Sequence, residues 1–347
     1  MEPTNPFPGS HNPAVVGDRG ALIAAVPHLL GYHPNDSLVV LSLTTDVPAT
    51  VDLILRVDLP NMTDAAQVAE GLTQIALRQR MSRVALLVVA PADEPDGGAG
   101  ELPQADLVDV CRKGFERADI AVLARLWIGS TRQSGQWRCY DHPSCGGVMP
   151  DPSTTPFAAM CVADGAITYA SRQDKAAILA PAPADVLARR AALLAAPLDT
   201  ADGGDLGRDF ALVAAAVESA RCGALPDSDE ELVELARALA SKQVRDACLS
   251  FGNTEADQAA AALWQCLTRG IPSPHRAQPA ALVAFAAYGR GDGVMATIAL
   301  DVASAAQPDH ELTGLLRDAL MAGIRPQRIC QIGVVVAERM RALLAAT

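Results

Sequence analysis

The stretch "LLGYHPNDSLVVLSL", Leu29–Leu43, contains the end of a helix, a turn and the start of a buried strand. Gly31 suits the left-handed position that ends a helix, and Pro34 follows it. Upstream, Asp18 can cap the start of the helix, because its side chain can accept a backbone N–H. Downstream, "SLVVLSL" is almost wholly apolar. We therefore predict a helix that leads through a tight turn into a core strand.

The segments that follow alternate between strand and helix patterns. "TVDLILRVDL" comes after a short loop, which predicts an antiparallel hairpin with "SLVVLSL". An amphipathic helix, the apolar strand "RVALLVVAP", a second helix and the strand "IAVLARLWI" come next, and "WRCY" reads as an edge strand. Strands separated by helices run parallel through right-handed crossovers. The N-terminal half is thus predicted to be an α/β domain on a mixed, partly parallel sheet.

The pattern changes at "GGVMPDPSTTP", and after Pro181 no strand is predicted. We expect a disordered tail over residues 1–17, the α/β domain over 18–180 and a helical domain over 181–347. Short connections between helices are typical of an all-helical domain. Its helices are predicted near Ala184–Ala196, Leu206–Arg221, Asp229–Ser250, Thr254–Arg269, Pro279–Arg290, Gly293–Ala306, Glu311–Ala322 and Pro326–Ala345.

One pair of these helices has a repeat-like pattern. In "AALVAFAAYGRGDGVMATIALDVASAAQPD", small residues stand at positions where a tetratricopeptide repeat has them, namely Ala284, Ala296 and Ala303. The large early residue of that motif is missing, and there is no second clear copy. We therefore predict a tetratricopeptide-repeat-like helical pair and no array.

The last helix, Pro326–Ala345, carries apolar residues at spacings of three and four. We expect it to dock through this stripe on the helical domain, with a dimer or partner interface as the alternative. The stripe consists of Ile329, Ile332, Val336, Met340 and Leu343.

Charge and composition narrow the class of function. The formal net charge is −12, and the sequence has 13 aromatic residues. Residues 1–150 hold 11 basic and 17 acidic side chains, and residues 151–347 hold 17 and 23, so neither part is a basic module. A nucleic-acid ligand is not expected, because phosphate binding needs a basic surface. The sequence contains no apolar run long enough to predict a membrane span. The N-terminus has no signal-peptide pattern. We expect a cytoplasmic protein with reduced cysteines.

The turn offers candidate functional residues in His33, Asp36 and Ser37. Members of a catalytic triad usually come from separate elements, so the turn itself explains these residues best. The alternative is the edge of a ligand pocket. Arg56 and Asp58 alternate at the end of the second strand and face one side of the sheet, where α/β proteins often bind ligands. These five residues are the candidate pocket, and no catalytic residue is predicted.

A second group of candidates lies in "CYDHPSC", which contains Cys139, His142 and Cys145. Thiolate and imidazole groups suit zinc, but a structural zinc site needs a fourth ligand, for which Cys161 and Asp141 are candidates. Unligated thiols, a metal site and a redox pair all stay open for this segment. No cofactor is otherwise predicted.

Several blocks together resemble a protein family of high-GC Gram-positive (actinobacterial) bacteria that is defined as a domain of unknown function. The most specific blocks are "LLGYHP" followed by "DSLVV", and "GRGDG" at Gly289–Gly293. The resemblance extends from about Leu22 to Pro326. It implies no activity, substrate or catalytic residue.

We therefore predict a non-catalytic interaction or regulatory protein whose helical half binds a protein or peptide partner. The alternatives are an enzyme or small-molecule binder that uses the strand ends, and a metal-supported module at Cys139–Cys145. Convergent acids, bases or nucleophiles at several strand ends would favour an enzyme, and the sequence shows only scattered ones. The partner's identity and the oligomeric state do not follow from the sequence.

Overall fold

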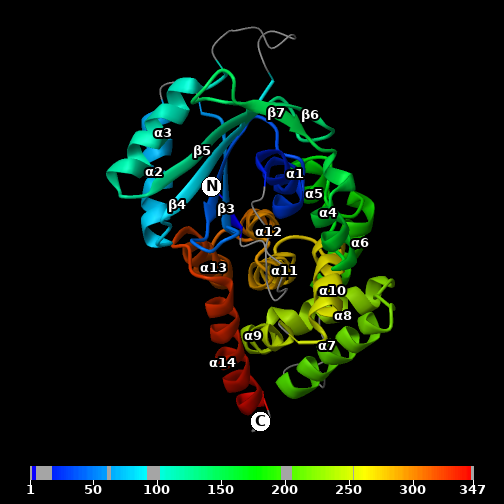
Figure 1. Ribbon diagram of the computed structural model, residues 1–347. Helices are drawn as coiled ribbons and strands as arrows, with labels where there is room; N and C mark the ends of the chain where they lie inside the picture. Colours follow the sequence, from blue (N-terminus) through cyan, green and yellow to red (C-terminus); the bar gives the residue numbers. More distant parts are fainter. Residues whose placement is uncertain are drawn as a thin grey trace. The chain divides into compact units, whose positions relative to one another are not determined.

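A computed structural model describes residues 2–4, 18–60, 64–91, 102–196, 205–252 and 254–344 (Figure 1). The chain divides into two compact units, Met1–Lys175 and Ala176–Thr347. The expected domain boundary at 180/181 lies five residues after the observed division between Lys175 and Ala176. Most of the expected tail, 1–17, lies outside the described residues, but Glu2–Thr4 form a short strand, β1.

Among the described residues, seven strands of the first unit form one sheet in the order β1-β3-β2-β4-β5-β6-β7. This confirms the predicted fold class for the N-terminal half. The remaining strands are β2 (Ser37–Leu43), β3 (Val51–Asp58), β4 (Arg83–Val89), β5 (Ala121–Ile128), β6 (Gly135–Cys139) and β7 (Gly146–Met149).

The sheet is mixed because β2 runs against both of its neighbours. It pairs antiparallel with β3, as the predicted hairpin requires, and antiparallel with β4. The strands β4 and β5 pair in parallel. Since β3 and β4 both oppose β2, β3, β4 and β5 run in the same direction. Their carboxyl ends therefore meet at the edge of the sheet where β2 begins, next to Ser37.

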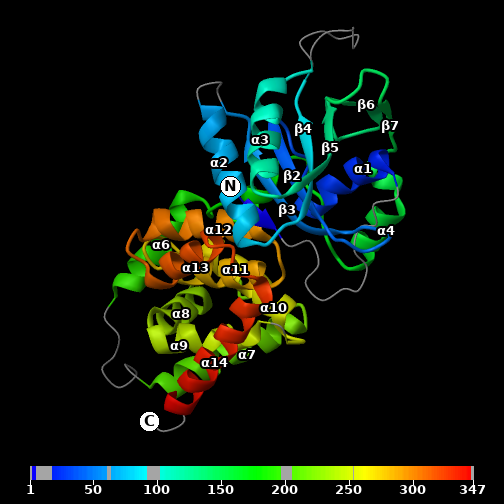
Figure 2. The same ribbon diagram turned by 60° about the vertical axis from the view of Figure 1, so that its left-hand side comes forward.

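Helices cover both faces of this sheet (Figures 1 and 2). The helices α2 (Ala65–Arg78) and α3 (Ala105–Arg117) bury one side each against strand residues such as Leu86 and Val88. The first helix, α1 (Arg19–Leu30), is apolar on nearly all sides and is buried along its length. Such a helix belongs inside a domain and not at its surface. Its start is capped by Asp18, whose carboxylate accepts the N–H of Ala21.

The stretch that joins α1 to β2 folds as predicted. Gly31 ends α1 in the left-handed conformation, with φ 74°. A Cβ at this position would collide with the Nζ of buried Lys175, which donates to the carbonyl of Leu30 at 3.1 Å. The left-handed backbone conformation and the lack of room for a Cβ beside Lys175 both favour glycine at this position.

One strand prediction near the end of this unit was wrong. The strand that contains "WRCY", β6, is not an edge strand, because β7 pairs with it antiparallel. Beyond the sheet, an isolated parallel bridge joins Tyr32 and Tyr169. The short helices α4 (Pro156–Ala163) and α5 (Arg172–Ala177) follow β7.

The second unit is helical throughout its described residues, which confirms the predicted class. Its helices agree with the prediction except that the segment Asp229–Ser250 is broken at Ser241. There the backbone turns extended, and the Ser241 hydroxyl caps a new helix by accepting the N–H of Val244. The helices are α6 (Ala184–Ala195), α7 (Leu206–Arg221), α8 (Asp229–Ala240), α9 (Lys242–Ala247), η3 (Cys248–Phe251), α10 (Asp257–Gly270), α11 (Ala277–Gly289), α12 (Gly293–Ala306), α13 (Glu311–Met321) and α14 (Pro326–Leu344).

The helices α11 and α12 form the predicted pair and lie side by side in both views (Figures 1 and 2). Gly291, with φ 78°, makes the turn between them, and Asp292 caps α12 through the N–H of Met295. Helix α11 is buried on all sides and forms the centre of the unit. The tetratricopeptide-like character of the pair stays a prediction.

The last helix docks through a stripe that overlaps the predicted one in part, because Ile329 is buried and Val336 and Met340 are half-buried. It packs against α9, η3 and α11. Ile329, Gly333 and Ala337 are buried, and Gly333 lies directly against the ring of Phe285. Ile332 and Leu343 are 48% and 55% exposed, so both were assigned to the wrong face.

Candidate functional site

The structure brings together three of the five candidate pocket residues at the carboxyl edge of β3. The Arg56 guanidinium donates from Nε to the Ser37 Oγ at 2.8 Å and pairs through Nη2 with the Asp58 Oδ1 at 2.6 Å. The Arg56 side chain is 10% exposed, whereas Asp58 is 84% exposed. Arg56 thus links the start of β2 to the end of β3.

The chemistry of this cluster is that of a structural clasp. The Ser37 hydroxyl accepts from Arg56 and donates its proton to the Asn35 carbonyl at 2.6 Å. A nucleophilic serine would instead donate to a general base. Asp36 holds a left-handed conformation, with φ 43°, and its carbonyl accepts the N–H of Leu59. These contacts support the interpretation of the segment as a turn.

His33 has different partners from the other four candidates. Its Nδ1–H donates to the Thr131 carbonyl at 2.8 Å, and its backbone N–H donates to the Tyr169 carbonyl. Burial is the main cause that lowers the pKa of His33, and the nearby Arg132 lowers it further. The imidazole is therefore neutral near pH 7 and ties the end of α1 to the loop after β5.

The segment of Cys139, His142 and Cys145 forms the connection between β6 and β7. Within the described residues, no group of three or more His, Cys, Asp and Glu side chains is arranged to hold a metal ion, and these three do not form one. His142 is exposed at the turn, where its carbonyl accepts the N–H of Cys145. The two cysteines, by contrast, lie opposite each other, Cys139 at the end of β6 and Cys145 just before β7.

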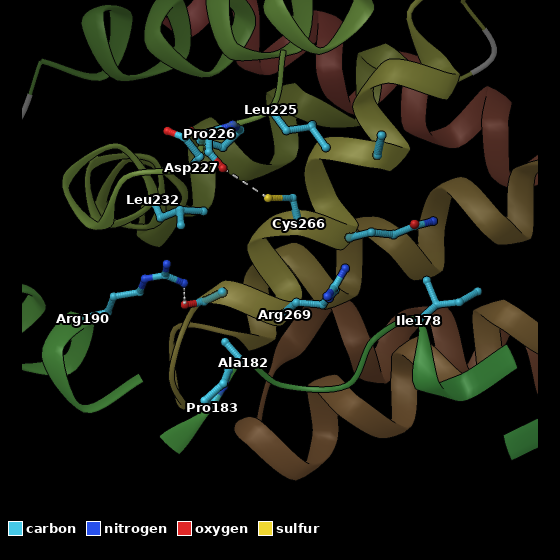
Figure 3. A pocket seen from close by; sticks show the side chains of 13 residues that line it. Ile178, Ala182, Pro183, Arg190, Leu225, Pro226, Asp227, Leu232, Cys266 and Arg269 are labelled. Atoms are coloured by element: carbon cyan, nitrogen blue, oxygen red, sulfur yellow. Dashed lines mark hydrogen bonds between the residues drawn. The ribbon is translucent and has the colours of Figure 1, made fainter. Parts of the chain in front are cut away.

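A cleft in the helical unit was not predicted. It has a volume of about 410 Å³ and lies among α6, α8, α10, the segment 178–183 and the loop 225–227 that precedes α8 (Figure 3). Ile178, Leu225 and Leu232 contribute apolar surface, and Gln265, Cys266 and Arg269 of α10 contribute polar groups.

The floor of the cleft is held by Arg190, a buried arginine of α6. Its Nε donates to the Asp229 Oδ1 at 2.7 Å, and its Nη1 donates to the Gly270 carbonyl at 2.8 Å. A Cβ at position 270 would collide with this guanidinium. On one wall, the N–H of Ala182 donates to the Arg269 carbonyl at 2.8 Å. These bonds fix three chain segments around a preformed hollow.

The polar groups on α10 differ in how they are engaged. The Cys266 thiol donates to the Pro226 carbonyl at 3.6 Å, and burial raises its pKa. Such a thiol stays protonated and is a poor nucleophile. The side chains of Gln265 and Arg269 make no hydrogen bond or ion pair with any part of the chain that the structure describes. Both side chains are therefore available to a ligand.

The sequence carries little signal for this cleft. Its lining residues come from segments between Ile178 and Gly270, and none of them stands in a recognisable motif. Arg190 could have been noticed only as a charge on a helix, and its buried ion pair with Asp229 needs the tertiary fold. The strand-end residues, in contrast, could be found because they follow a strand pattern directly.

Comparison with known proteins places the chain in a family. A family model described as "Domain of unknown function (DUF4192)" matches residues 20–327. Since this match covers most of the chain, the protein belongs to that family. No curated protein and no solved structure matches the chain. None of the helices that the structure describes is long and apolar enough to cross a membrane.

Proposed function

We propose that this member of the DUF4192 family is a non-catalytic interaction protein that binds a segment of a protein partner in the cleft of its helical unit. The observation that carries the proposal is a hollow of about 410 Å³ with an unpaired guanidinium, Arg269, on its wall. Ligand sites commonly combine apolar lining with a few polar groups that fix orientation.

The openness of the cleft favours a peptide segment over a small molecule. Leu225, Asp227 and Arg269 line it and are all exposed to solvent. A site for a small molecule usually encloses most of its ligand. A chain segment that crosses an open cleft needs no such enclosure, because the rest of the partner can cover the rim.

The charges in the cleft define the partner's anchor. Arg269 can hold one carboxylate by charge-assisted hydrogen bonds. The Cys266 thiol donates a hydrogen bond to the carbonyl of Pro226, which directly precedes Asp227. Arg269 stands about one helical turn beyond Cys266 (Figure 3). Because the Asp227 carboxylate lines the same cleft, it would repel a ligand that carries several negative charges. The partner segment is therefore expected to carry one acidic or C-terminal carboxylate beside an apolar residue.

The states of the Cys266 and Ser37 side chains support a non-catalytic role for the cleft and the strand ends. The Cys266 thiol is protonated, and the Ser37 hydroxyl donates to a backbone carbonyl. Neither is activated for attack. All eight cysteines are free, which suits a reducing compartment. The proposal therefore sets the binding event in the cytoplasm of a high-GC Gram-positive bacterium.

A peptide selection tests the proposal. Full-length protein is used to select from a displayed library of random peptides, and the selected peptides are synthesised and titrated by fluorescence polarisation. Arg269→Glu should weaken binding at least tenfold, because a hydrogen bond to a charged group contributes about 1.5–3 kcal/mol. Leu225→Asp should weaken it as well, since Leu225 lines the apolar part.

Arg339→Glu is the matched control, because it makes the same change of charge on an exposed residue of α14. It should leave the affinity unchanged. Equal affinities of wild type, Arg269→Glu and Leu225→Asp for the selected peptides would contradict the proposal. So would a selection that yields no peptide above background.

A further inference from the structure

We propose that Cys139 and Cys145 form a reversible redox pair, in which Cys145 reacts with a low-molecular-weight disulfide and Cys139 resolves the product into an internal disulfide. This site lies in the first unit and does not depend on the cleft. It would make the hairpin of β6 and β7 a modification site that responds to the thiol–disulfide state of its surroundings.

The backbone places the two cysteines directly opposite each other. In the pairing of β6 with β7, Arg138 is the partner of Gly146, so the next pair outward is Cys139 with Cys145. The N–H of Cys139 donates to the Cys145 carbonyl at 2.9 Å. Opposite residues of an antiparallel pair direct their side chains to the same face, about 5.5 Å apart at Cα when they are hydrogen-bonded. A disulfide spans Cα distances of about 4.4–6.8 Å.

Cys145 has the environment of an attacking thiol. The Arg19 Nη1 donates to its Sγ at 2.7 Å. Arg19 is the first residue of α1, and because α1 packs against β7 the fold places its backbone near Cys145. Cys145 is also partly exposed. Cys145 is therefore the thiol of the pair that a small disulfide can reach, and a hydrogen-bond donor stands beside its sulfur.

Cys139 has the environment of a resolving thiol. It is only 6% exposed, and its thiol donates to the Asp141 Oδ2 at 3.4 Å. Burial is the main cause that raises the pKa of Cys139, and the Cys145 side chain contributes to the rise. Cys139 therefore stays protonated until Cys145 has reacted. Asp141, which the Arg125 Nε holds at 2.9 Å, accepts the hydrogen bond of the Cys139 thiol and so orients it.

The reaction balances with one small disulfide as oxidant. The Cys145 thiolate attacks one sulfur of the disulfide RSSR, which forms a mixed disulfide on Cys145 and releases RS⁻. Cys139 then loses its proton to the medium and attacks the Cys145 sulfur, and the second RS⁻ leaves. The protein dithiol is oxidised by two electrons, and RSSR is reduced to two RSH. A small dithiol reverses both steps.

The other cysteines provide internal controls. Cys222 is exposed and free. Cys111 is buried, and burial raises its pKa to about 12. The proposal predicts that Cys145 reacts first and that only its adduct is resolved.

The experiment exposes full-length protein to oxidised glutathione, stops the reaction with acid and locates modifications by intact mass and peptide mapping. Wild type should lose two hydrogens at Cys139 and Cys145 without keeping glutathione there. Cys139→Ser, or Cys139→Ala if the first variant is misfolded, should retain glutathione on Cys145. Arg19→Gln should slow the reaction of Cys145 several-fold, whereas Cys222→Ser should not change it.

Two results would overturn the proposal. One is a glutathione adduct on Cys145 of wild type that persists without forming the internal disulfide. The other is a rate of reaction at Cys145 that is no higher than the rate at Cys222.

Discussion

Mild acid should destabilise the helical unit through His310, the residue that caps α13. His310 is 4% exposed. Its Nδ1 accepts the Thr313 N–H at 3.3 Å and lies 2.7 Å from the Thr313 hydroxyl, and its Nε2–H donates to the Gln278 Oε1 at 2.9 Å. The Arg245 Nη1 lies 3.3 Å from Nε2. The neutral imidazole fits this site, and a proton on Nδ1 would remove the cap.

Burial, followed by the charge of Arg245, lowers the pKa of His310 from 6.5 to about 4. The unfolded chain therefore binds a proton between pH 6.5 and 4 that the folded chain does not. Stability from this residue is fully present above pH 6.5 and is lost as the pH falls through 4. The complete loss corresponds to roughly 3 kcal/mol, and the loss between pH 7.5 and 5.5 to about 1 kcal/mol.

The variant His310→Asn separates this effect from that of the carboxylates. Asparagine can cap the helix but does not titrate. Denaturant unfolding of wild type and variant at pH 7.5 and 5.5 should show a fall in stability that is about 1 kcal/mol larger in wild type. An NMR titration of the imidazole gives the pKa and the tautomer directly. A measured pKa of 6 or above, or equal pH dependence in both proteins, would refute the reasoning.

Three further substitutions test the packing. Ala337→Asp should lower the melting temperature sharply, because it buries a carboxylate under α14, whereas Ile332→Asp should change it little; the reverse order would restore the stripe predicted from the sequence. Gly31→Ala should cost at least 1–2 kcal/mol in denaturant unfolding, because the left-handed backbone is strained and Lys175 occupies the space; an unchanged midpoint would argue against that turn. Ser228→Ala should cost about 1 kcal/mol by the same assay, since Ser228 and Glu231 form a capping box at α8, and no loss would mean that the box does not form.

Local patterns predicted most of the elements. The apolar run Ser37–Leu43 has the observed bounds of β2, and Leu206–Arg221 and Gly293–Ala306 have those of α7 and α12. In each case a clear start or stop signal stands beside a strong apolar pattern. The break at Ser241 was missed because serine competes for backbone hydrogen bonds only weakly, so its capping role depends on context. Gly146–Met149 was missed as a strand because glycines carry no alternating pattern.

Tertiary packing decided what the patterns could not. Helix α14 docks through the face that carries Gly333, because the missing side chain lets the helix approach Phe285. A pattern of large apolar residues does not predict this contact. The strand-end candidates Ser37, Arg56 and Asp58 could be predicted to be neighbours because they share one edge. Their mutual hydrogen bond and ion pair, which make the cluster a structural clasp, depend on side-chain geometry. The cleft depends on Arg190 and Asp229, which only the fold brings together.

Photo-crosslinking tests most directly whether a partner segment occupies the cleft. A selected peptide is synthesised with a photoreactive residue beside its carboxylate, irradiated on the full-length protein and mapped by mass spectrometry. We predict crosslinks to the walls of the cleft, within 178–183, 225–232 and 262–270, and their loss in Arg269→Glu. Crosslinks that fall instead on the strand ends around Ser37 and Arg56, or on α14, would contradict the account.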